Sequence, residues 1–230
     1  MRRPDPAQLV RVASLLRPLL DELVFAGGAV TSLLVTDEGA GPPRTTLDVD
    51  AIAAITSYAE YTTFGERLRA LGFYEDQREG APVCRWVQKT TIRDVMPLDE
   101  KVLGFSNRWY LSAMETAIRH SIGNDLQMRV VTAPHFLATK IEAFHGRGRH
   151  DFLASHDIED LIYVVDGRPE VIDEARCEAK KLRRYLNSEV SRLLATPAFV
   201  DSLPGHLFPD HASQLRLTTV IRRLKDLASL

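Results

Sequence analysis

The spacing of apolar residues in the first part of the chain predicts a helix followed by two strands. Residues 6–22 carry leucine and valine at positions that share one helical face, and Pro18 should kink or split this helix. Residues 23–26 are all apolar, which is typical of a short buried strand. One or two helical turns over residues 29–35 and a loop rich in glycine and proline then lead to a second strand over residues 46–52.

Strand patterns continue in the next part of the chain. A helix over residues 56–71 should end at Gly72, and we expect three strands after it, over residues 73–77, 84–88 and 90–96 with a tight turn near Lys89. Two further segments, residues 115–121 and 126–132, predict a hairpin around Gly123-Asn124-Asp125. Residues 113–120 are also compatible with a helix.

From Pro134 onward the apolar spacing is helical. We predict helices over residues 135–144 and 155–165, a long helix over residues 170–194 and a terminal helix. The fold class is therefore α/β (α+β), with a mixed β-sheet core flanked by helices and a mainly helical C-terminal part. We expect two domains, residues 1–133 and residues 134–230, packed together.

Composition and charge exclude several classes of protein. A chain of 230 residues with 45% hydrophobic content can bury a sizeable core. A formal net charge of −2 provides no overall positive field, so a nucleic-acid partner would need local basic patches. The two cysteines, Cys84 and Cys177, lack a metal-binding spacing and are interpreted as reduced thiols. Without a signal peptide or a long apolar run, we expect a cytoplasmic protein with no membrane partner.

The residues between Gly27 and Asp50 carry the first candidate chemistry. Paired glycines, Gly27 and Gly28, would let backbone amides approach phosphate oxygens if a nucleoside triphosphate bound there. Asp48 and Asp50 alternate with Val49 on a predicted strand, so their side chains share a face with Cα atoms roughly 6.6 Å apart. Carboxylate oxygens at this spacing suit Mg²⁺ or Mn²⁺. A strand-to-helix turn and a solvated strand edge are the structural alternatives.

Asp94 is the candidate third carboxylate. It lies on the last of the three predicted strands, shortly before Pro97. Ile92, Asp94 and Met96 share one face of this strand, and an ionisable residue between two apolar ones is costly to bury unless it is paired or bound to a metal. The structural alternative is that Asp94 only ends the strand.

Asp157 falls within the apolar arc of the helix predicted over residues 155–165, whereas Asp160 lies at the rim of that arc. Acidic residues in a first turn often only complement the helix dipole. A carboxylate directed toward the core instead suggests an ion pair, with Lys140 or an arginine as the partner of Asp157.

Four short motifs in a fixed order resemble one known superfamily. Gly27-Gly28 followed by Arg44-x-Thr46-x-Asp48-x-Asp50 is similar to the first motif of the DNA polymerase β-like nucleotidyltransferases, in particular the AbiEii-type, abortive-infection toxin branch. The later motifs are Asp94, then Lys140-x-x-Ala143, and then Asp157-x-x-Asp160-Leu161. The resemblance covers about residues 23–166. It departs from the family pattern at Ala29, where Ser or Thr is common, and at His156, where the family has arginine.

The resemblance implies a metal-dependent nucleotidyltransferase. Asp48, Asp50 and Asp94 would hold Mg²⁺ or Mn²⁺, and Asp94 would also act on the attacking hydroxyl. Lys140 would neutralise charge that develops on phosphate. The remaining implied contacts to the nucleotide come from Gly27, Gly28, Arg44, Thr46, Asp157 and Asp160.

The partners implied are a nucleoside triphosphate, an RNA acceptor such as the 3′ end of a tRNA, and a cognate antitoxin. Basic clusters that could contact RNA phosphates lie in the loop with Arg147 and Arg149, at residues 180–184 and at residues 216–225, although such clusters are usually solvated helix faces. A small hydroxyl compound, as for aminoglycoside nucleotidyltransferases, and a protein are alternative acceptors. A non-catalytic nucleotide-binding or interaction module is the alternative from another class.

Overall fold

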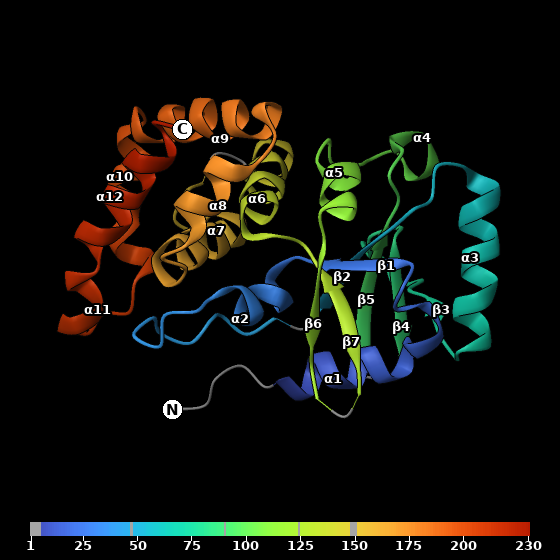
Figure 1. The fold of residues 1–230 in the computed structure, drawn as a ribbon. Coiled ribbons are helices and arrows are strands. Elements are labelled where there is room, and N and C mark those ends of the chain that lie inside the picture. The colour runs from blue at the N-terminus through green and yellow to red at the C-terminus, as the bar shows by residue number, and fades with distance from the viewer. Residues whose placement is uncertain (1–5, 47, 90, 124, 148–150) are drawn as a thin grey trace. The chain divides into compact units, whose positions relative to one another are not determined.

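The protein has a mixed α/β architecture built on one sheet. A computed structural model describes the chain except for residues 1–5, 47, 90, 124 and 148–150. The sheet has seven strands in the order β3-β4-β5-β2-β1-β7-β6, and helices flank it and form the C-terminal part (Figure 1), which confirms the predicted fold class. Of the residues that carried sequence predictions, Thr90, Asn124 and Arg149 lie outside the described residues.

The chain forms two compact units. The first contains the chain up to Val30 together with Thr45–Thr132, and the second contains Thr31–Arg44 and Ala133–Leu230. We expected the first domain to run over residues 1–133, which includes the segment Thr31–Arg44. Its contacts to the C-terminal helices, described below, assign it to the second unit instead.

The first unit holds the whole sheet. Its strands are β1 (Leu23–Ala26), β2 (Asp48–Ala53), β3 (Tyr74–Glu75), β4 (Arg85–Gln88), β5 (Thr91–Met96), β6 (Ile118–Ser121) and β7 (Gln127–Val130). Its helices are α1 (Pro6–Leu15), α3 (Tyr58–Ala70), α4 (Glu100–Leu103) and α5 (Tyr110–Glu115), with short 3₁₀ turns η1 (Arg17–Leu19) and η2 (Gly28–Val30). The helix predicted over residues 6–22 is split as expected, but it ends at Leu15, before Pro18, which lies within η1. Helix α3 ends at Ala70, just before Gly72, as predicted.

The hairpin predicted before residue 133 is confirmed. Strands β6 and β7 pair antiparallel, with Ser121 opposite Gln127. The helical alternative over residues 113–120 holds only as far as Glu115, where α5 ends. Alternation of polar and apolar residues therefore outweighed local helix propensity in this segment.

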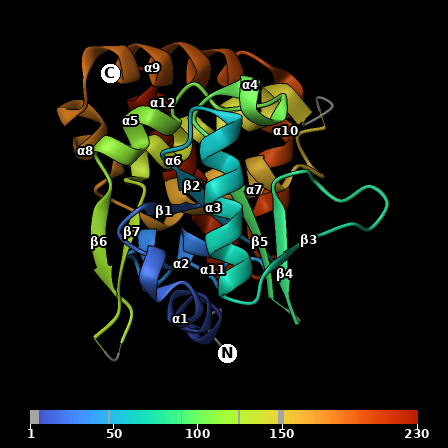
Figure 2. The same cartoon turned by 90° about the vertical axis from the view of Figure 1, so that its right-hand side faces the viewer.

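The two faces of the sheet differ in burial: α3 covers one face, and the strand register decides which side chains lie on it. Trp86 of β4 lies opposite Arg93 of β5, and both are buried on the face that α3 covers (Figure 2). The indole Nε1 of Trp86 donates to the Tyr61 hydroxyl of α3. Because side chains alternate along a strand, the neighbouring residues Arg85 and Asp94 point to the opposite face.

The second unit is helical. It contains α2 (Thr31–Leu34), α6 (Ala133–Arg147), α7 (His156–Gly167), α8 (Val171–Cys177), α9 (Lys180–Leu194), α10 (Pro197–Ser202), a 3₁₀ turn η3 (Leu203–His206), α11 (His211–Leu215) and α12 (Leu217–Leu227). The predicted long helix over residues 170–194 is wrong, because the chain extends at Glu178 and Ala179 and separates α8 from α9. The break lies at Glu178 and Ala179, where the spacing of apolar residues does not indicate an interruption of the helix.

Within the described part of the chain, no helix has both the length and the apolar character needed to cross a membrane.

Candidate active site

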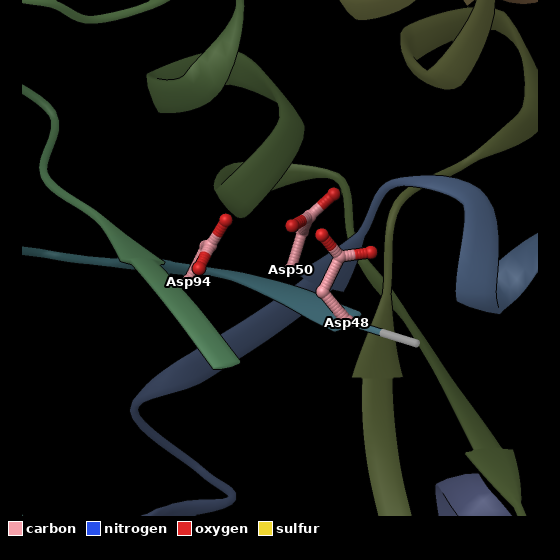
Figure 3. Close-up of side chains that lie close together, drawn as sticks. All are labelled: Asp48, Asp50 and Asp94. Atoms are coloured by element: carbon pink, nitrogen blue, oxygen red, sulfur yellow. The ribbon is translucent and has the colours of Figure 1, made fainter. Parts of the chain in front are cut away.

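Three carboxylates converge on one face of the sheet in the first unit. Asp48 and Asp50 come from β2 and Asp94 from β5, and Figure 3 shows their side chains rising from the same side of these strands. Each can offer one oxygen such that the three oxygens lie within 4.8 Å of one another. Among the residues that the structure describes, this is the only such acidic group with a spacing suited to a metal ion.

The strand register explains why these acids meet. Strands β2 and β5 run parallel, and Asp50 lies directly beside Asp94. Asp48 precedes Asp50 by two residues, so it projects from the same face one step along the strand. On the other side of β2, strand β1 runs antiparallel and places Ala26 opposite Asp50. The site therefore follows from the alternation predicted for β2 together with a pairing of strands that are distant in sequence.

Gly27 leaves room for Asp50. Gly27 follows Ala26 at the end of β1 and has a φ of +68°, in the left-handed region. A Cβ atom at this position would lie only 1.8 Å from Oδ2 of Asp50, so no residue other than glycine fits without a shift. The sequence did not indicate this close approach, which explains why glycine is needed at residue 27. The predicted phosphate contacts of Gly27 and Gly28 remain predictions.

Thr46 and Arg85 hold the carboxylates in place. The Thr46 hydroxyl donates to Oδ1 of Asp48 at 2.7 Å, so this predicted nucleotide-binding residue contacts an acid of the site. Arg85 of β4 donates from Nε and Nη2 to the two oxygens of Asp94, at 2.7 and 2.8 Å, and Nη2 also reaches Oδ2 of Asp48 at 3.0 Å. The hydrogen bond to Asp94 raises the pKa of Arg85 above its usual value.

Arg85 was absent from the predicted site, although its position carried a signal. Strands β4 and β5 were expected as neighbours around a tight turn near Lys89, and pairing outward from that turn matches Gln88 with Thr91. The same register brings Arg85 opposite Asp94. Counting the register from the turn would therefore have found an arginine facing the third carboxylate.

The charges of the site also act on Cys84, which precedes Arg85. Burial, together with the negative charges of Asp94 and Asp50, raises the pKa of the Cys84 thiol to about 12. Cys84 is therefore a protonated, unreactive thiol at neutral pH. Neither Cys84 nor the exposed Cys177 forms a disulfide, as expected.

Four further predicted residues meet in the second unit. Lys140 of α6 contacts two acids of α7, with Nζ 3.0 Å from Oδ1 of Asp157 and 2.6 Å from Oδ2 of Asp160. Arg44 binds both oxygens of Asp160, at 2.8 and 2.9 Å. Arg147 likewise binds both oxygens of Asp157, each at 3.0 Å. We call these five residues the α6–α7 ion cluster.

The cluster confirms the ion pair predicted for Asp157 and extends it to Asp160. Both acids and Lys140 are buried. Burial alone would raise the pKa of Asp157, but the hydrogen bond from Arg147 and the charge of Lys140 outweigh it and lower the pKa below its ordinary value. Lys140 and Arg44 are thus engaged with aspartates, so a contact of either with phosphate would require one of these ion pairs to be exchanged.

His156 lies at the first position of α7, where the resembled family has arginine. Its ring Nδ1 is 3.0 Å from the carboxylate of Glu159, and the ring is largely exposed. The arginines of the ion cluster come instead from Arg44 and Arg147. The substitution at residue 156 therefore leaves both buried aspartates of α7 paired with arginine.

The three carboxylates of the first unit fit a hard divalent cation. They offer oxygen ligands, which Mg²⁺ and Mn²⁺ prefer, and they come from two adjacent strands that fix their spacing. The Asp48 side chain is 38% exposed, so water and substrate oxygens can reach the site and complete the coordination. Such an arrangement can bind a metal and a phosphate-bearing substrate together.

Comparison with models of protein families and with curated proteins found no match.

Proposed function

We propose that the protein is a metal-dependent nucleotidyltransferase, which moves a nucleoside monophosphate from a nucleoside triphosphate to an acceptor hydroxyl. The observation that supports this most is the convergence of Asp48, Asp50 and Asp94, whose carboxylate oxygens can approach one another within 4.8 Å. Three acids in such proximity repel one another unless a cation is near. The order of the four motifs resembles that of the AbiEii-type branch, and this resemblance supports nucleotidyl transfer as the class of reaction.

In the proposed reaction, Asp48, Asp50 and Asp94 would hold the metal. When bound, Mg²⁺ would supply positive charge to the triphosphate and favour the ionised acceptor hydroxyl. Asp94 orients that hydroxyl and accepts its proton. The hydroxyl oxygen forms a bond to the α-phosphorus while the bond to the bridging oxygen breaks, and pyrophosphate leaves with that electron pair.

The other predicted residues have indirect or substrate-facing roles in this proposal. Thr46 orients Asp48 through its hydrogen bond, and Gly27 provides the space that Asp50 occupies. Gly28 stays a proposed phosphate contact. Lys140 and Arg44 hold Asp157 and Asp160 in the resting protein, and we propose that the α6–α7 ion cluster contributes to nucleotide binding by exchanging these partners.

The proposed acceptor is RNA, with the 3′ end of a tRNA as the leading candidate, and the proposed biological role is that of a toxin with a cognate antitoxin. This part of the proposal rests on the resemblance alone. Small hydroxyl compounds and proteins are the alternative acceptors. The proposed substrates are molecules of the cytoplasm, so a cytoplasmic location belongs to the same proposal.

The test is transfer of label from nucleoside triphosphates. The purified protein is incubated with Mg²⁺, each α-labelled nucleoside triphosphate in turn and total RNA, beside Asp48→Asn and Asp94→Asn. The control is Asp173→Asn, which removes an exposed acid from α8. We expect labelled RNA of tRNA size with the wild type and Asp173→Asn, and none with the two site variants.

Label found on a small molecule or on protein would identify that molecule as the acceptor in place of RNA, and nucleotidyl transfer would remain the reaction. Equal labelling by Asp48→Asn and the wild type would exclude these carboxylates as the catalytic metal site. Absence of transfer to every acceptor class, with intact folding, would support the non-catalytic module instead.

A further inference from the structure

Arg85 lies where a metal ion would act as the counter-charge of the carboxylates. Its Nη2 bridges two acids, at 2.8 Å from Asp94 and 3.0 Å from Asp48. Its Nε occupies the other oxygen of Asp94. Both oxygens of Asp94 and one oxygen of Asp48 therefore face one guanidinium.

A divalent ion that binds the oxygens contacted by Arg85 would compete with it. Mg²⁺ binds carboxylate oxygens at about 2.1 Å, so an ion on Asp94 or on Oδ2 of Asp48 would lie within about 5 Å of the nearest Arg85 nitrogen in its present position. The guanidinium carries a fixed positive charge, and the site is only partly open to water, with 19% of the Arg85 side chain exposed. Repulsion between the two cations is therefore weakly screened.

The site also has a way to release Arg85. Arg85 is held in place by the pairing of β4 with β5, and it contacts the carboxylates through its guanidinium. Rotation about the side-chain bonds moves the guanidinium away without breaking the ladder between β4 and β5. The long arginine side chain regains rotational freedom on release, which offsets part of the free energy of the lost contacts.

We propose that Arg85 is a displaceable counter-cation: it holds Asp48 and Asp94 together in the metal-free protein, and it leaves them when a divalent ion binds. The inference rests on the proposed metal site and adds a residue that sets its affinity. Arg85 lowers the affinity for the metal and stabilises the empty site. The released guanidinium stays on the same face of the sheet, within reach of anionic groups that a phosphate-bearing substrate brings to the metal.

The test compares metal affinity in Arg85→Gln with that in the wild type. Glutamine keeps the polar side chain but removes the charge. Arg119→Gln is the matched control, because Arg119 is an exposed arginine on β6 of the same unit. Binding of Mn²⁺ is measured from the electron paramagnetic resonance signal of the free ion, which needs neither a nucleotide nor transfer activity.

We expect Arg85→Gln to bind Mn²⁺ about 10-fold more tightly than the wild type, whereas Arg119→Gln binds as the wild type does. In EDTA, Arg85→Gln should melt at a lower temperature than the wild type, and Mg²⁺ should raise its melting temperature by more. Equal or weaker Mn²⁺ binding by folded Arg85→Gln would overturn the proposal.

A measurement on the wild type keeps the test independent of the variant's folding. The Nε–H resonance of Arg85, assigned by its absence from Arg85→Lys, should lose its protection from solvent exchange when Mg²⁺ is added. An unchanged resonance at saturating Mg²⁺ would show that the metal binds without displacing Arg85. If neither the wild type nor Arg85→Gln bound Mn²⁺, the metal site itself, and with it the proposed function, would fall.

Discussion

At the scale of single residues, the site depends on the absence of a side chain at residue 27 as much as on the three carboxylates. Gly27 lies between the end of β1 and the Asp50 carboxylate, in a backbone conformation that other residues adopt only with strain. A methyl group there would displace the carboxylate. The same residue thus meets a requirement of the backbone and a requirement of space.

Gly27→Ala should therefore weaken metal binding as well as stability. We expect a loss of more than about 1 kcal/mol in the free energy of unfolding from the positive φ, and weaker Mn²⁺ binding because Asp50 must move. Gly80→Ala is the control: Gly80 has a φ of +77°, yet a Cβ atom there would meet nothing within 4 Å. Mn²⁺ titration and urea unfolding measure both effects. Unchanged Mn²⁺ affinity in Gly27→Ala would refute the steric argument.

Arg93 shows the opposite situation, a buried charge without a hydrogen-bond acceptor among the described residues. Its side chain is fully buried, and no described residue accepts a hydrogen bond from its Nε, Nη1 or Nη2. Burial lowers the pKa of Arg93 to about 9, which still leaves the group charged at neutral pH. The ring of Phe73, with its centroid 4.9 Å from the guanidinium carbon, provides a cation–π contact.

Replacing this charge by an apolar side chain of similar length should stabilise the protein. We expect Arg93→Met to raise the free energy of unfolding by about 1–3 kcal/mol, because it removes an uncompensated charge from the core. Arg119→Met, at an exposed position, should change it by less than about 0.5 kcal/mol. Urea unfolding at pH 7 measures both. A destabilised Arg93→Met protein would indicate that the guanidinium is solvated or bonded within the core.

At the scale of elements, α6 and α7 are held together by charge as well as by apolar packing. Lys140 is shared by Asp157 and Asp160, and an arginine binds each acid. Neutralising one of these acids would leave Lys140 and one arginine with less compensation in a buried setting. Because the pKa of Asp157 is lowered on folding, its contribution to stability is complete above its ordinary value of 3.8 and disappears as the pH falls through the lowered value.

Asp157→Asn should cost about 3–5 kcal/mol of unfolding free energy at pH 7. Below about pH 4 the wild type should lose the stability that this carboxylate provides, so the difference between the two proteins should shrink. Thermal melts between pH 2.5 and 7 measure this convergence, with Asp173→Asn as the exposed control. Parallel curves for the wild type and Asp157→Asn would mean that the pairs of Asp157 do not contribute.

The elements were the part of the fold most accessible from sequence. Apolar periodicity located β1, β2, α3 and β7, because each buries one face or a whole segment. Strand β6 is mostly exposed, and the turn residues between it and β7 helped to locate it. The break between α8 and α9 was missed, since tertiary packing decides where a run with helical propensity is interrupted. Among site residues, Asp48 and Asp50 follow from alternation alone. The role of Gly27 depends on the pairing of β1 with β2 over a distance, which local pattern does not encode, whereas that of Arg85 follows from the register of the neighbouring strands β4 and β5.

At the scale of the whole molecule, the chain passes between its two units three times. It leaves the first unit after Val30, returns at Thr45 and leaves again after Thr132. The segment Thr31–Arg44 is joined to the C-terminal helices by side-chain contacts such as that of Arg44 with Asp160. The boundary predicted from the sequence matches the third of these crossings, near residue 133, but the sequence did not predict that Thr31–Arg44 belongs to the second unit.

A substitution in the segment Thr31–Arg44 should therefore destabilise the second unit. We expect Arg44→Met to destabilise α7 by about 3 kcal/mol, because Asp160 loses a bidentate partner. Amide hydrogen exchange should accelerate in α6 and α7, whereas β1 and β2, which flank the segment in sequence, should keep their protection. Arg17→Met, in η1 of the first unit, is the control. Faster exchange in β1 and β2 alone would contradict the assignment of this segment.

The contacts of Thr31–Arg44 also have a consequence for how the chain folds. Arg44 meets Asp160 across 116 residues, Thr36 meets Glu170 across 134, and Asp37 meets Arg216 across 179. Contacts of such separation raise the contact order and close large loops, both of which slow folding. During synthesis this segment leaves the ribosome long before its partners exist. The ion pair of Asp37 with Arg216 can form only after residue 216 has emerged, so the segment completes its side-chain contacts late in synthesis.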